Sequence, residues 1–321
     1  MGGLTDIKGI LVGQAHNEKA ATGCTVVLCP EGAVGGVAIT GGSTSTRQMG
    51  GLTPGHVVDR VHAVLFTGGS AFGLDAAAGV MNYLEEQGVG FDVGVARVPI
   101  VPTAALFDLK LGEAKVRPDP EMAAQACRAA NDGEIAQGSV GAGCGATVGK
   151  LNGPEQATKG GLGTASLKGR DGLIVSGLVA LNSFGDIRHY ETGKIIAGAR
   201  TSPESKVFTD TEAHLLETCN EVPHAFRNTT LALVATNAKL TRSGCVRMAR
   251  AAAQGLARVI RPYGTLFDGD LVIALSRGEL EADPHTLGLM GGRVLAESVG
   301  NAVMEADGMG LIPAYRDLVA E

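Results

Sequence analysis

The chain contains no tryptophan, and aromatic residues make up only 4% of its 321 residues. With few large anchors and 48 glycines, the core is expected to consist of close-packed small side chains joined by tight turns. Glycine-rich chains can also be disordered, but here proline is scarce and 45% of the residues are hydrophobic. The composition therefore predicts a globular protein with a sizeable core.

A concentrated basic surface is also missing. The formal net charge is −6, which argues against a nucleic-acid partner, because binding to phosphates needs a clustered positive face. The densest group of basic residues is predicted to be the solvated face of one helix. It comprises Arg242, Arg247, Arg250, Arg258 and Arg261.

Several common catalytic and metal-binding motifs are absent from the sequence. The six cysteines form no C-x-x-C pair, HExxH does not occur, and the seven histidines are dispersed. The segment GGSAFG lacks both the glycine spacing of a hydrolase elbow and the lysine of a phosphate loop. We therefore expect no metal and no organic cofactor, and the cysteines are predicted to be mostly buried thiols.

Long apolar runs are absent as well. None approaches the roughly 18 residues that a membrane-spanning helix requires. The N-terminal segment has no basic region followed by a long apolar stretch, and Asp6 occupies the position where a myristoylation signal needs Ser or Thr. The expectation is a soluble, cytoplasmic protein with no membrane partner.

Short β-type runs and helical periodicity alternate along the first half of the chain. Residues 24–30 and 33–40 are predicted to form two paired strands joined by a turn at Glu31–Gly32. Residues 61–67 form a buried strand that ends at Gly68–Gly69, and helical spacing runs from Ser70 to Gly88. A second helix is expected over residues 120–130.

The second half of the chain continues this alternation. Strands are predicted within residues 141–150, 171–182, 231–236 and 270–276, and helices over 243–260, capped by Ser243 and stopped by Pro262, and over 285–306. Residues 185–227 are interpreted as a long, partly mobile connection with at least one helical turn at 215–219. The C-terminal third supplies strands that complete the same sheets, so residues 1–321 are predicted to form a single domain with a layered α/β sandwich.

The segment RNTTLALVATNAKLT contains the most informative junction. Two threonines stand directly before a strand, after a long polar connection, and Asn228 precedes them. A threonine hydroxyl is a poor nucleophile at neutral pH unless a base lies close to it. Cleavage before Thr229 would free an α-amino group with a pKa near 8, and this amine could act as that base. An Asn-Thr dipeptide alone is more often an ordinary strand start.

Three further features contain residue types that could support such a nucleophile. Asp268 and Asp270 are two positions apart at the entry to a strand, where extended backbone would point both carboxylates the same way. Lys150 could stabilise negative charge, and the Asn182 amide could donate to an oxyanion. Taken singly, each is more often a turn or surface residue.

In combination these segments resemble the self-processing aminopeptidases and amidases of the DmpA type, the β-peptidyl aminopeptidases and the nylon-oligomer hydrolase. The resemblance covers nearly the whole chain, in the family's order. It rests on the N-terminal segment LTDIKGILVGQAHNEKAATGCTVVLCPEGAVGGVAITGG, then VHAVLFTGGSAFGLDAAAGVMNYLEEQGVGF, VPIVPTAALFDL, GAGCGATVGK, ALNSFGD, NTTLALVATNAKLT and RPYGTLFDGDLVIAL.

The resemblance implies a four-layer α/β/β/α sandwich of the N-terminal-nucleophile-hydrolase type. It implies autocleavage between Asn228 and Thr229 into residues 1–228 and residues 229–321, with Thr229 as the catalytic nucleophile. Asp268, Asp270, Lys150 and Asn182 match the family's other catalytic positions. The family is usually assembled as a tetramer of processed pairs, so a homotetramer is expected. The substrate would be a small peptide or an aliphatic amide.

Two departures from the family pattern stand out. Phe107 occupies the position where those relatives carry a tyrosine that assists at the active site, which removes a hydroxyl from the expected oxyanion site. The run GGSTSTRQ differs from the GGAPGTRE-like run of many members, although Arg47 keeps its place.

The substrate and even the reaction remain open at this level. The Asn-Thr junction and the Asp-Gly-Asp pattern resemble the branch that cuts linear aliphatic amides such as 6-aminohexanoate oligomers. An aminopeptidase restricted to small, D- or β-residues is a second reading. Acyl transfer like that of ornithine acetyltransferases is a third, weakened by the absence of their Ala-Thr-Met-Leu type junction. A non-catalytic binding protein that no longer processes itself is the fourth.

Overall fold

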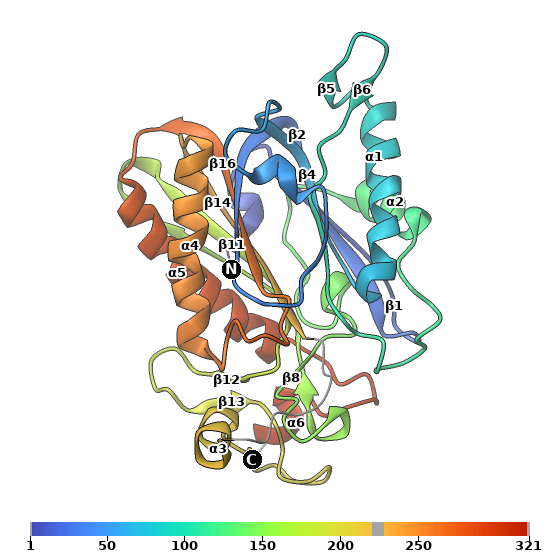
Figure 1. Ribbon diagram of the computed structural model, residues 1–321, viewed down its shortest axis with the longest axis vertical. Coiled ribbons are helices and arrows are strands. Elements are labelled where there is room, and N and C mark those ends of the chain that lie inside the picture. The colour runs from blue at the N-terminus through green and yellow to red at the C-terminus, as the bar shows by residue number, and fades with distance from the viewer. Residues whose placement is uncertain (1, 220–227, 320–321) are drawn as a thin grey trace.

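A computed structural model describes residues 2–219 and 228–319 of the chain, and Figure 1 shows its arrangement. The largest sheet in this part of the chain has nine strands. Its order is β10 (Gly161–Lys168), β11 (Ile174–Asn182), β14 (Thr229–Ala238), β16 (Leu271–Leu280), β2 (Thr22–Ile39), β4 (Arg60–Thr67), β7 (Thr103–Ala105) and β3 (Ser45–Arg47), with β1 (Leu11–Asn17) paired to β2.

The long strand β2 divides this sheet into two layers. Its first part pairs with β1 and β4, and its last part pairs with β16. The register shifts between Leu28 and Ala33, where Gly32 has a positive φ of 79° that favours glycine. The predicted pair of strands with a turn at Glu31–Gly32 is therefore wrong, because the residues on both sides of Gly32 stay in one strand.

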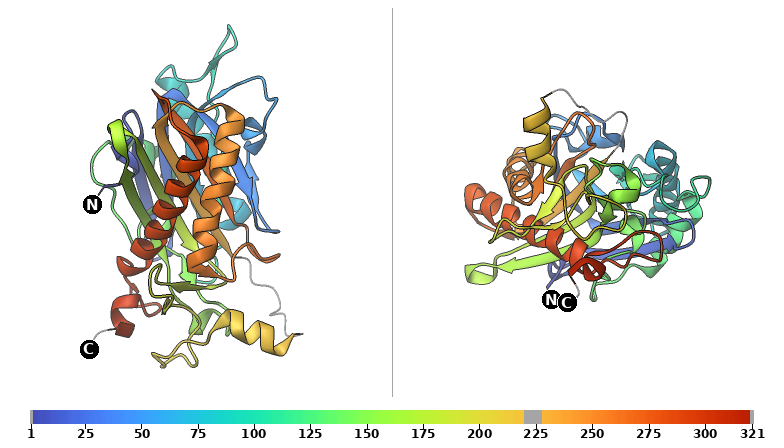
Figure 2. Two further views of the ribbon diagram at one scale, coloured as in Figure 1. Left: turned by 90° about the vertical axis from the view of Figure 1, so that its left-hand side faces the viewer. Right: turned by 90° about the horizontal axis from the view of Figure 1, so that it is seen from below.

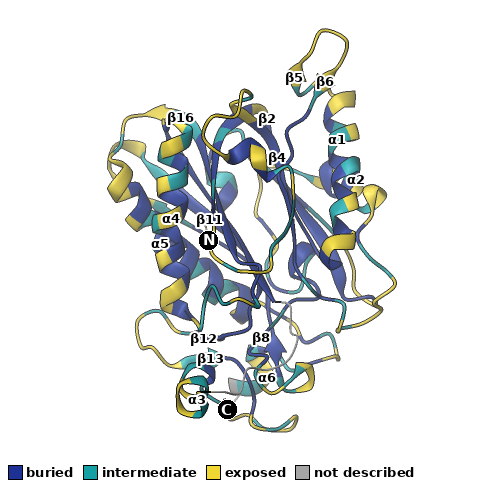
Figure 3. Ribbon diagram, viewed as in Figure 1, coloured by how far each residue is buried: buried dark blue, intermediate teal, exposed yellow. Residues whose placement is uncertain are grey.

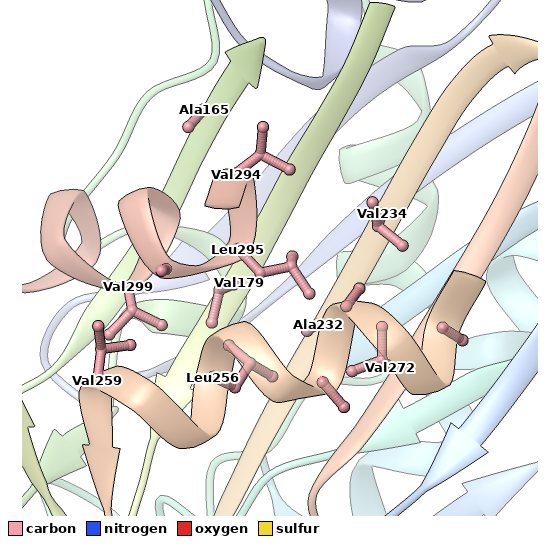
Figure 4. Close-up of a cluster of buried hydrophobic side chains, with 14 of the residues drawn as sticks. Ala165, Val179, Ala232, Val234, Leu256, Val259, Val272, Val294, Leu295 and Val299 are labelled. Atoms are coloured by element: carbon pink, nitrogen blue, oxygen red, sulfur yellow. The ribbon is translucent and has the colours of Figure 1, made fainter. Parts of the chain in front are cut away.

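Three hydrophobic clusters fill the spaces between four layers. One lies between the helices α4 (Arg242–Val259) and α5 (Pro284–Met304) and the half-sheet that contains β14 (Figure 4). A second lies between the two half-sheets. A third lies between the half-sheet that contains β4 and the helices α1 (Ala77–Glu86) and α2 (Pro120–Ala129). The view from below in Figure 2 shows the two helical layers on opposite sides of the strands.

Strand β14 illustrates how the sequence produces these layers. Leu231 and Leu233 belong to the cluster between the half-sheets, whereas Ala232 and Val234 belong to the cluster under the helices. Successive side chains of a strand point to opposite faces, so a strand that is apolar at every position can be buried on both sides. The predicted four-layer α/β/β/α sandwich is confirmed, and Figure 3 shows buried strands beneath helices whose outer faces are exposed.

Shorter elements gather mainly at the lower end of the sandwich in Figure 1. They are β8 (Thr147–Val148), β9 (Thr158–Lys159), β12 (Asp186–Arg188), β13 (Ile195–Ala197), β15 (Ile260–Arg261), α3 (Thr211–Thr218) and α6 (Tyr315–Val319). A hairpin of β5 (Phe91–Asp92) and β6 (Arg97–Val98) projects from the opposite end. No helix in the described part of the chain is long and apolar enough to cross a bilayer.

Several local predictions need correction. The strand expected within 141–150 shrinks to β8, because residues 141–143 form a 3₁₀ turn. Helix α4 is capped by Thr241, whose side chain accepts from the Gly244 N–H, and not by Ser243. The connection predicted over 185–227 contains β12, β13 and α3, while its last part, 220–227, lies outside the described residues. Of the cysteines, Cys219 is exposed and the other five are buried, as predicted.

Candidate active site

Thr229 is the first residue of β14, and this strand lies between β11 and β16 near the middle of the sheet. The antiparallel register of β11 and β14 places Asn182 opposite Thr229. Asn228 and Thr229 are both buried, with exposed fractions of 0% and 4%. The tertiary structure therefore brings together two residues that are 47 positions apart in sequence, as the resemblance implied.

The carbonyl group of Asn228 has two donors. The Thr229 hydroxyl donates to the Asn228 oxygen at 2.5 Å, and the Gly269 N–H donates to the same oxygen at 2.6 Å. Since a C=O bond is about 1.23 Å long, the Thr229 Oγ lies at most about 3.7 Å from the Asn228 carbonyl carbon. A hydroxyl that could act as a nucleophile is thus within contact distance of a polarised carbonyl.

Gly269 can occupy this position because it has no side chain. A Cβ at residue 269 would lie 2.7 Å from the Thr229 Oγ and 2.9 Å from the Ser43 carbonyl oxygen. Both distances are shorter than ordinary contacts between heavy atoms. The glycine between the two aspartates therefore leaves space for the hydroxyl of Thr229.

The two carboxylates of the Asp-Gly-Asp segment shape the backbone around Thr229. Asp268 accepts from the Thr265 hydroxyl at 2.5 Å and from the Phe184 N–H at 3.3 Å. Asp270 accepts from the Thr230 N–H at 2.6 Å and from the Gly264 N–H at 3.0 Å. Among the described residues, the Thr229 hydroxyl is not a hydrogen-bond partner of either one. In the uncleaved chain these two carboxylates therefore hold the surrounding backbone and not the Thr229 hydroxyl itself.

Lys150 and Asn182 form a buried pair next to this segment. The Lys150 Nζ donates to the Asn182 side-chain oxygen at 2.8 Å and to the Asn182 carbonyl at 3.0 Å. The Asn182 Nδ2 donates to the Phe107 carbonyl at 2.9 Å. Asn182 is thus oriented by both of its amide atoms, and one of its two N–H donors is engaged by Phe107.

The charged groups of the site alter one another's ionisation. Burial lowers the pKa of Lys150 to about 7, although Asp268 and Asp270 oppose that shift. Burial and the neighbouring Asp268 raise the pKa of Asp270 to about 8, and burial also raises the pKa of Asp268. A cluster with such shifts, next to a candidate nucleophile, is typical of an active site.

A small cavity of about 30 Å³ adjoins the junction, enough for about two water molecules. Its walls combine apolar, charged and backbone groups. They come from Phe107, Asp108, Lys110, Leu111, Gly145, Thr147, Lys150, Pro154 and Asn228. The cavity therefore borders Asn228 together with Lys150 and Phe107.

Sequence reasoning missed three buried charged residues, of which one, Asp108, lines this cavity. Asp108 accepts from the Thr22 hydroxyl at 2.7 Å and the Gly69 N–H at 2.8 Å, and burial raises its pKa to about 6. Lys159 donates to three backbone carbonyls of residues 143, 146 and 160, and the Arg200 guanidinium binds carbonyls of residues 155, 157 and 203. No sequence motif identifies these residues, because their partners are mainly backbone groups, which every residue type carries.

No group of three or more His, Cys, Asp or Glu side chains that could hold a metal ion occurs within residues 2–219 and 228–319. The candidate site contains a hydroxyl, backbone N–H groups, a carboxamide, a lysine and two carboxylates. This set is suited to acyl transfer onto a hydroxyl.

The chain is similar in sequence to proteins that carry a name. The chain is 39% identical to an uncharacterized aminopeptidase of Mycobacterium leprae (strain TN), over 98% of this chain and 93% of that protein. It is 31% identical to the 6-aminohexanoate-oligomer endohydrolase of Kocuria sp. (strain KY2), over 94% of this chain and 84% of that protein.

Solved structures show the same fold. The L-aminopeptidase D-Ala-esterase/amidase from Ochrobactrum anthropi, described as a variant of the Ntn hydrolase fold, matches with a TM-score of 0.72 and 18% identity, over 98% of this chain and 91% of that one. A β-aminopeptidase of Burkholderia sp. matches with a TM-score of 0.68 and 21% identity, over 99% and 92%.

The family model that matches is that of peptidase family S58, and it covers residues 3–312. Together with the relatives that align over nearly the whole chain, it establishes that this protein belongs to peptidase family S58 and is a hydrolase of that family.

Proposed function

We propose that this protein cleaves its own backbone between Asn228 and Thr229 and then hydrolyses amide bonds with the freed Thr229 as nucleophile. The observation that supports this most directly is the position of the Thr229 hydroxyl, 2.5 Å from the Asn228 carbonyl oxygen, on a carbonyl that also accepts the Gly269 N–H. The products would be residues 1–228 and a fragment of 93 residues, 229–321.

Self-cleavage would proceed in two steps. The Thr229 Oγ attacks the Asn228 carbonyl carbon, the bond from that carbon to the Thr229 nitrogen breaks, and the hydroxyl proton passes to that nitrogen. The resulting ester is then hydrolysed by water, which leaves a carboxylate on Asn228 and restores the Thr229 hydroxyl. The Gly269 N–H would stabilise the oxyanion of the tetrahedral intermediate that forms on the Asn228 carbonyl carbon.

Turnover would use the same atoms on a substrate. The free α-amino group of Thr229 takes the hydroxyl proton as the Oγ attacks the substrate carbonyl, and that proton leaves with the departing amine. Water then releases the acyl group from Thr229. Asn182 would contribute a donor to the oxyanion, while Lys150, Asp268 and Asp270 would orient the surrounding backbone and balance the charge of the ammonium.

The substrate is assigned to short peptides or linear aliphatic amides. Relatives named as aminopeptidases and as 6-aminohexanoate-oligomer endohydrolases both align over most of the chain, so both classes are candidates. Comparing release of nitroaniline from aminoacyl p-nitroanilides with cleavage of 6-aminohexanoate oligomers would separate the two classes. A tetramer of processed pairs in the cytoplasm remains our expectation for its assembly and location.

The decisive experiment is the intact mass of freshly purified protein under denaturing conditions. Two fragments, the smaller beginning at Thr229, are expected for the wild type, and a single chain of 32.6 kDa is expected for Thr229→Ala. Thr230→Val is the matched control, because it removes the neighbouring hydroxyl and leaves that of Thr229. A Thr229→Ala protein that still cleaved itself would refute the assignment. A wild-type chain that stayed whole and inactive for days would favour a binding protein instead.

A further inference from the structure

The carboxamide of Asn182 uses three of its four hydrogen-bonding positions within the protein. Its Oδ1 accepts from the Lys150 Nζ at 2.8 Å and from the Thr147 N–H at 3.0 Å, which occupies both lone pairs. One N–H of its Nδ2 donates to the Phe107 carbonyl at 2.9 Å. Within residues 2–219 and 228–319 the second N–H has no acceptor, so it is the donor that Asn182 can offer to a substrate oxygen.

The direction of this second N–H depends on the Phe107 carbonyl. Asn182 lies directly opposite Thr229 in the antiparallel pair of β11 and β14, and side chains that are opposite in such a pair lie on the same face. The two N–H groups of a carboxamide share one plane, so the acceptor of the first determines where the second points. A rotation of the Phe107 carbonyl would therefore turn the remaining donor away from Thr229.

Asp108 fixes the peptide group that carries this carbonyl. It follows Phe107 directly, and its side chain is 4% exposed. Its carboxylate accepts from the Thr22 hydroxyl at 2.7 Å and from the Gly69 N–H at 2.8 Å. These bonds attach it to the start of β2 and to the turn after β4. Because the peptide group is planar, an anchored Asp108 restricts rotation of the Phe107 carbonyl that Asn182 contacts.

The carboxylate of Asp108 has one position in this environment. A Cβ at residue 68 would overlap the Asp108 Oδ2 and the Thr22 Oγ, and a Cβ at residue 145 would lie 2.7 Å from the Asp108 Cβ. The glycines at these positions allow the side chain to fit closely between two backbone segments. Each carboxylate oxygen already has a donor, so Asp108 is bound to the protein itself although it lines the cavity next to Asn228.

We propose that Asp108 is a positioning residue, which holds the Phe107 carbonyl so that the second N–H of Asn182 points to the oxyanion formed beside Thr229. This rests on the proposed function, in which self-cleavage and turnover share one nucleophile and one oxyanion position. Asp108 touches neither the nucleophile nor the substrate, and it acts through the main chain of residue 107. For this task a phenylalanine at residue 107 serves as well as a tyrosine.

A double-mutant cycle tests whether Asp108 acts through Asn182. The variants are Asp108→Ala, Asn182→Ala and both together, and the rates are self-cleavage by intact mass and kcat for a p-nitroanilide in chains that have processed. We expect Asn182→Ala to lose at least about 10²-fold and Asp108→Ala about 10²-fold, with KM changed less than kcat. The double variant should be at most about threefold slower than Asn182→Ala, because the donor that Asp108 positions is already absent.

Two further variants separate positioning from a general loss of stability. Asp108→Asn keeps an acceptor for the Gly69 N–H and places an amide beside the Thr22 hydroxyl, so it should lose less than about tenfold. Asp186→Ala is the matched control, because Asp186 is fully buried and its carboxylate accepts from two backbone N–H groups at 2.8 and 2.7 Å. Any loss from Asp186→Ala should be the same factor with and without the Asn182 side chain.

Thermal unfolding of each variant shows whether it is folded. If Asp108→Ala does not fold, Thr22→Val replaces it in the cycle, since it removes one of the two bonds at similar size and should lose about tenfold. Equal losses in the two Asn182 backgrounds overturn the proposal, as does an Asp108→Asn loss as large as that of Asp108→Ala. Wild-type rates in folded Asp108→Ala or Asn182→Ala also overturn it, and leave Thr229 as the nucleophile. A wild-type chain that stays whole refutes the proposed function instead.

Discussion

Substitution of Gly269 by alanine should stop self-cleavage through a steric effect on a single atom. The added Cβ would lie 2.7 Å from the Thr229 Oγ and 2.9 Å from the Ser43 carbonyl oxygen. An ordinary contact requires about 3.5 Å or more, so the hydroxyl and the Gly269 backbone must separate by up to about 1 Å. Both hydrogen bonds to the Asn228 carbonyl would lengthen as a result.

The size of the effect follows from how strongly attack depends on distance. Displacing a reacting group by about 1 Å typically costs about 10²-fold in rate, and loss of one oxyanion donor costs about 10²- to 10³-fold. We therefore expect self-cleavage to slow by at least about 10²-fold. Overpacking at a buried site should lower the free energy of unfolding by only about 1–3 kcal/mol, so the precursor should still fold.

The assay is the time course of intact mass after purification, at one temperature and pH, with thermal unfolding measured on the same samples. Gly50→Ala is the matched control, because Gly50 is exposed and an added Cβ there meets no atom within 4 Å. If folded Gly269→Ala cleaves within threefold of the Gly50→Ala rate, the hydroxyl does not need the space beside Gly269. The geometry described for Thr229 would then be wrong.

Three further outcomes are expected. Lys150→Met removes both hydrogen bonds from Nζ to Asn182 and should slow self-cleavage, measured by intact mass, by about 10²-fold. Unchanged cleavage would show that Asn182 needs no support from Lys150. Asp268→Asn leaves the shape of residue 268 but replaces one acceptor by a donor, so the Phe184 or Thr265 bond is lost and kcat should fall more than KM rises in a p-nitroanilide assay. Burial raises the pKa of Asp108 from 3.8 to about 6, so folding is favoured while this group is protonated. In a Thr229→Ala background the free energy of unfolding should therefore lose about 2 kcal/mol from Asp108 between pH 4 and pH 6, and urea titrations of Asp108→Asn should lack that component.

Local sequence signals predicted the elements that form the site, but less often their boundaries. The apolar run after Asn228 predicted a strand, and β14 begins at Thr229. The helical pattern after residue 242 predicted α4, although the capping residue was wrong, because serine is the better cap by residue type and only the structure shows that Thr241 caps the helix. A glycine such as Gly32 indicates a turn and a bulge equally well, and only strand pairing distinguishes them.

The roles of the two aspartates show why part of the site could not be predicted. Their spacing on extended backbone predicted that both carboxylates would point the same way and could support the nucleophile. In the structure their oxygens accept backbone N–H groups and the Thr265 hydroxyl, and the group that reaches the junction is the N–H of the glycine between them. A backbone donor carries no signature in residue type, so a motif search finds the neighbouring side chains instead.

The burial of Asp108, Lys159 and Arg200 could not be predicted from the sequence for a related reason. Each is almost fully buried, and each is bound mainly by backbone atoms, or by one hydroxyl and one N–H in the case of Asp108. In sequence they look like surface charges, since burial of such residues is rare and depends on partners that come from distant segments.

The sequence alone determined the alternating α/β pattern, the position of the Asn-Thr junction before a strand, and the set of residue types that could serve it. These follow from periodicity and from the chemistry of single side chains, which are local properties. The tertiary structure alone decided that β2 bends one sheet into two layers, that Asn182 stands opposite Thr229, and that Phe267 and Gly269 bind the main chain of Asn228. Those relations depend on strand order and register, and these are fixed only when segments far apart in the chain pack against a common core.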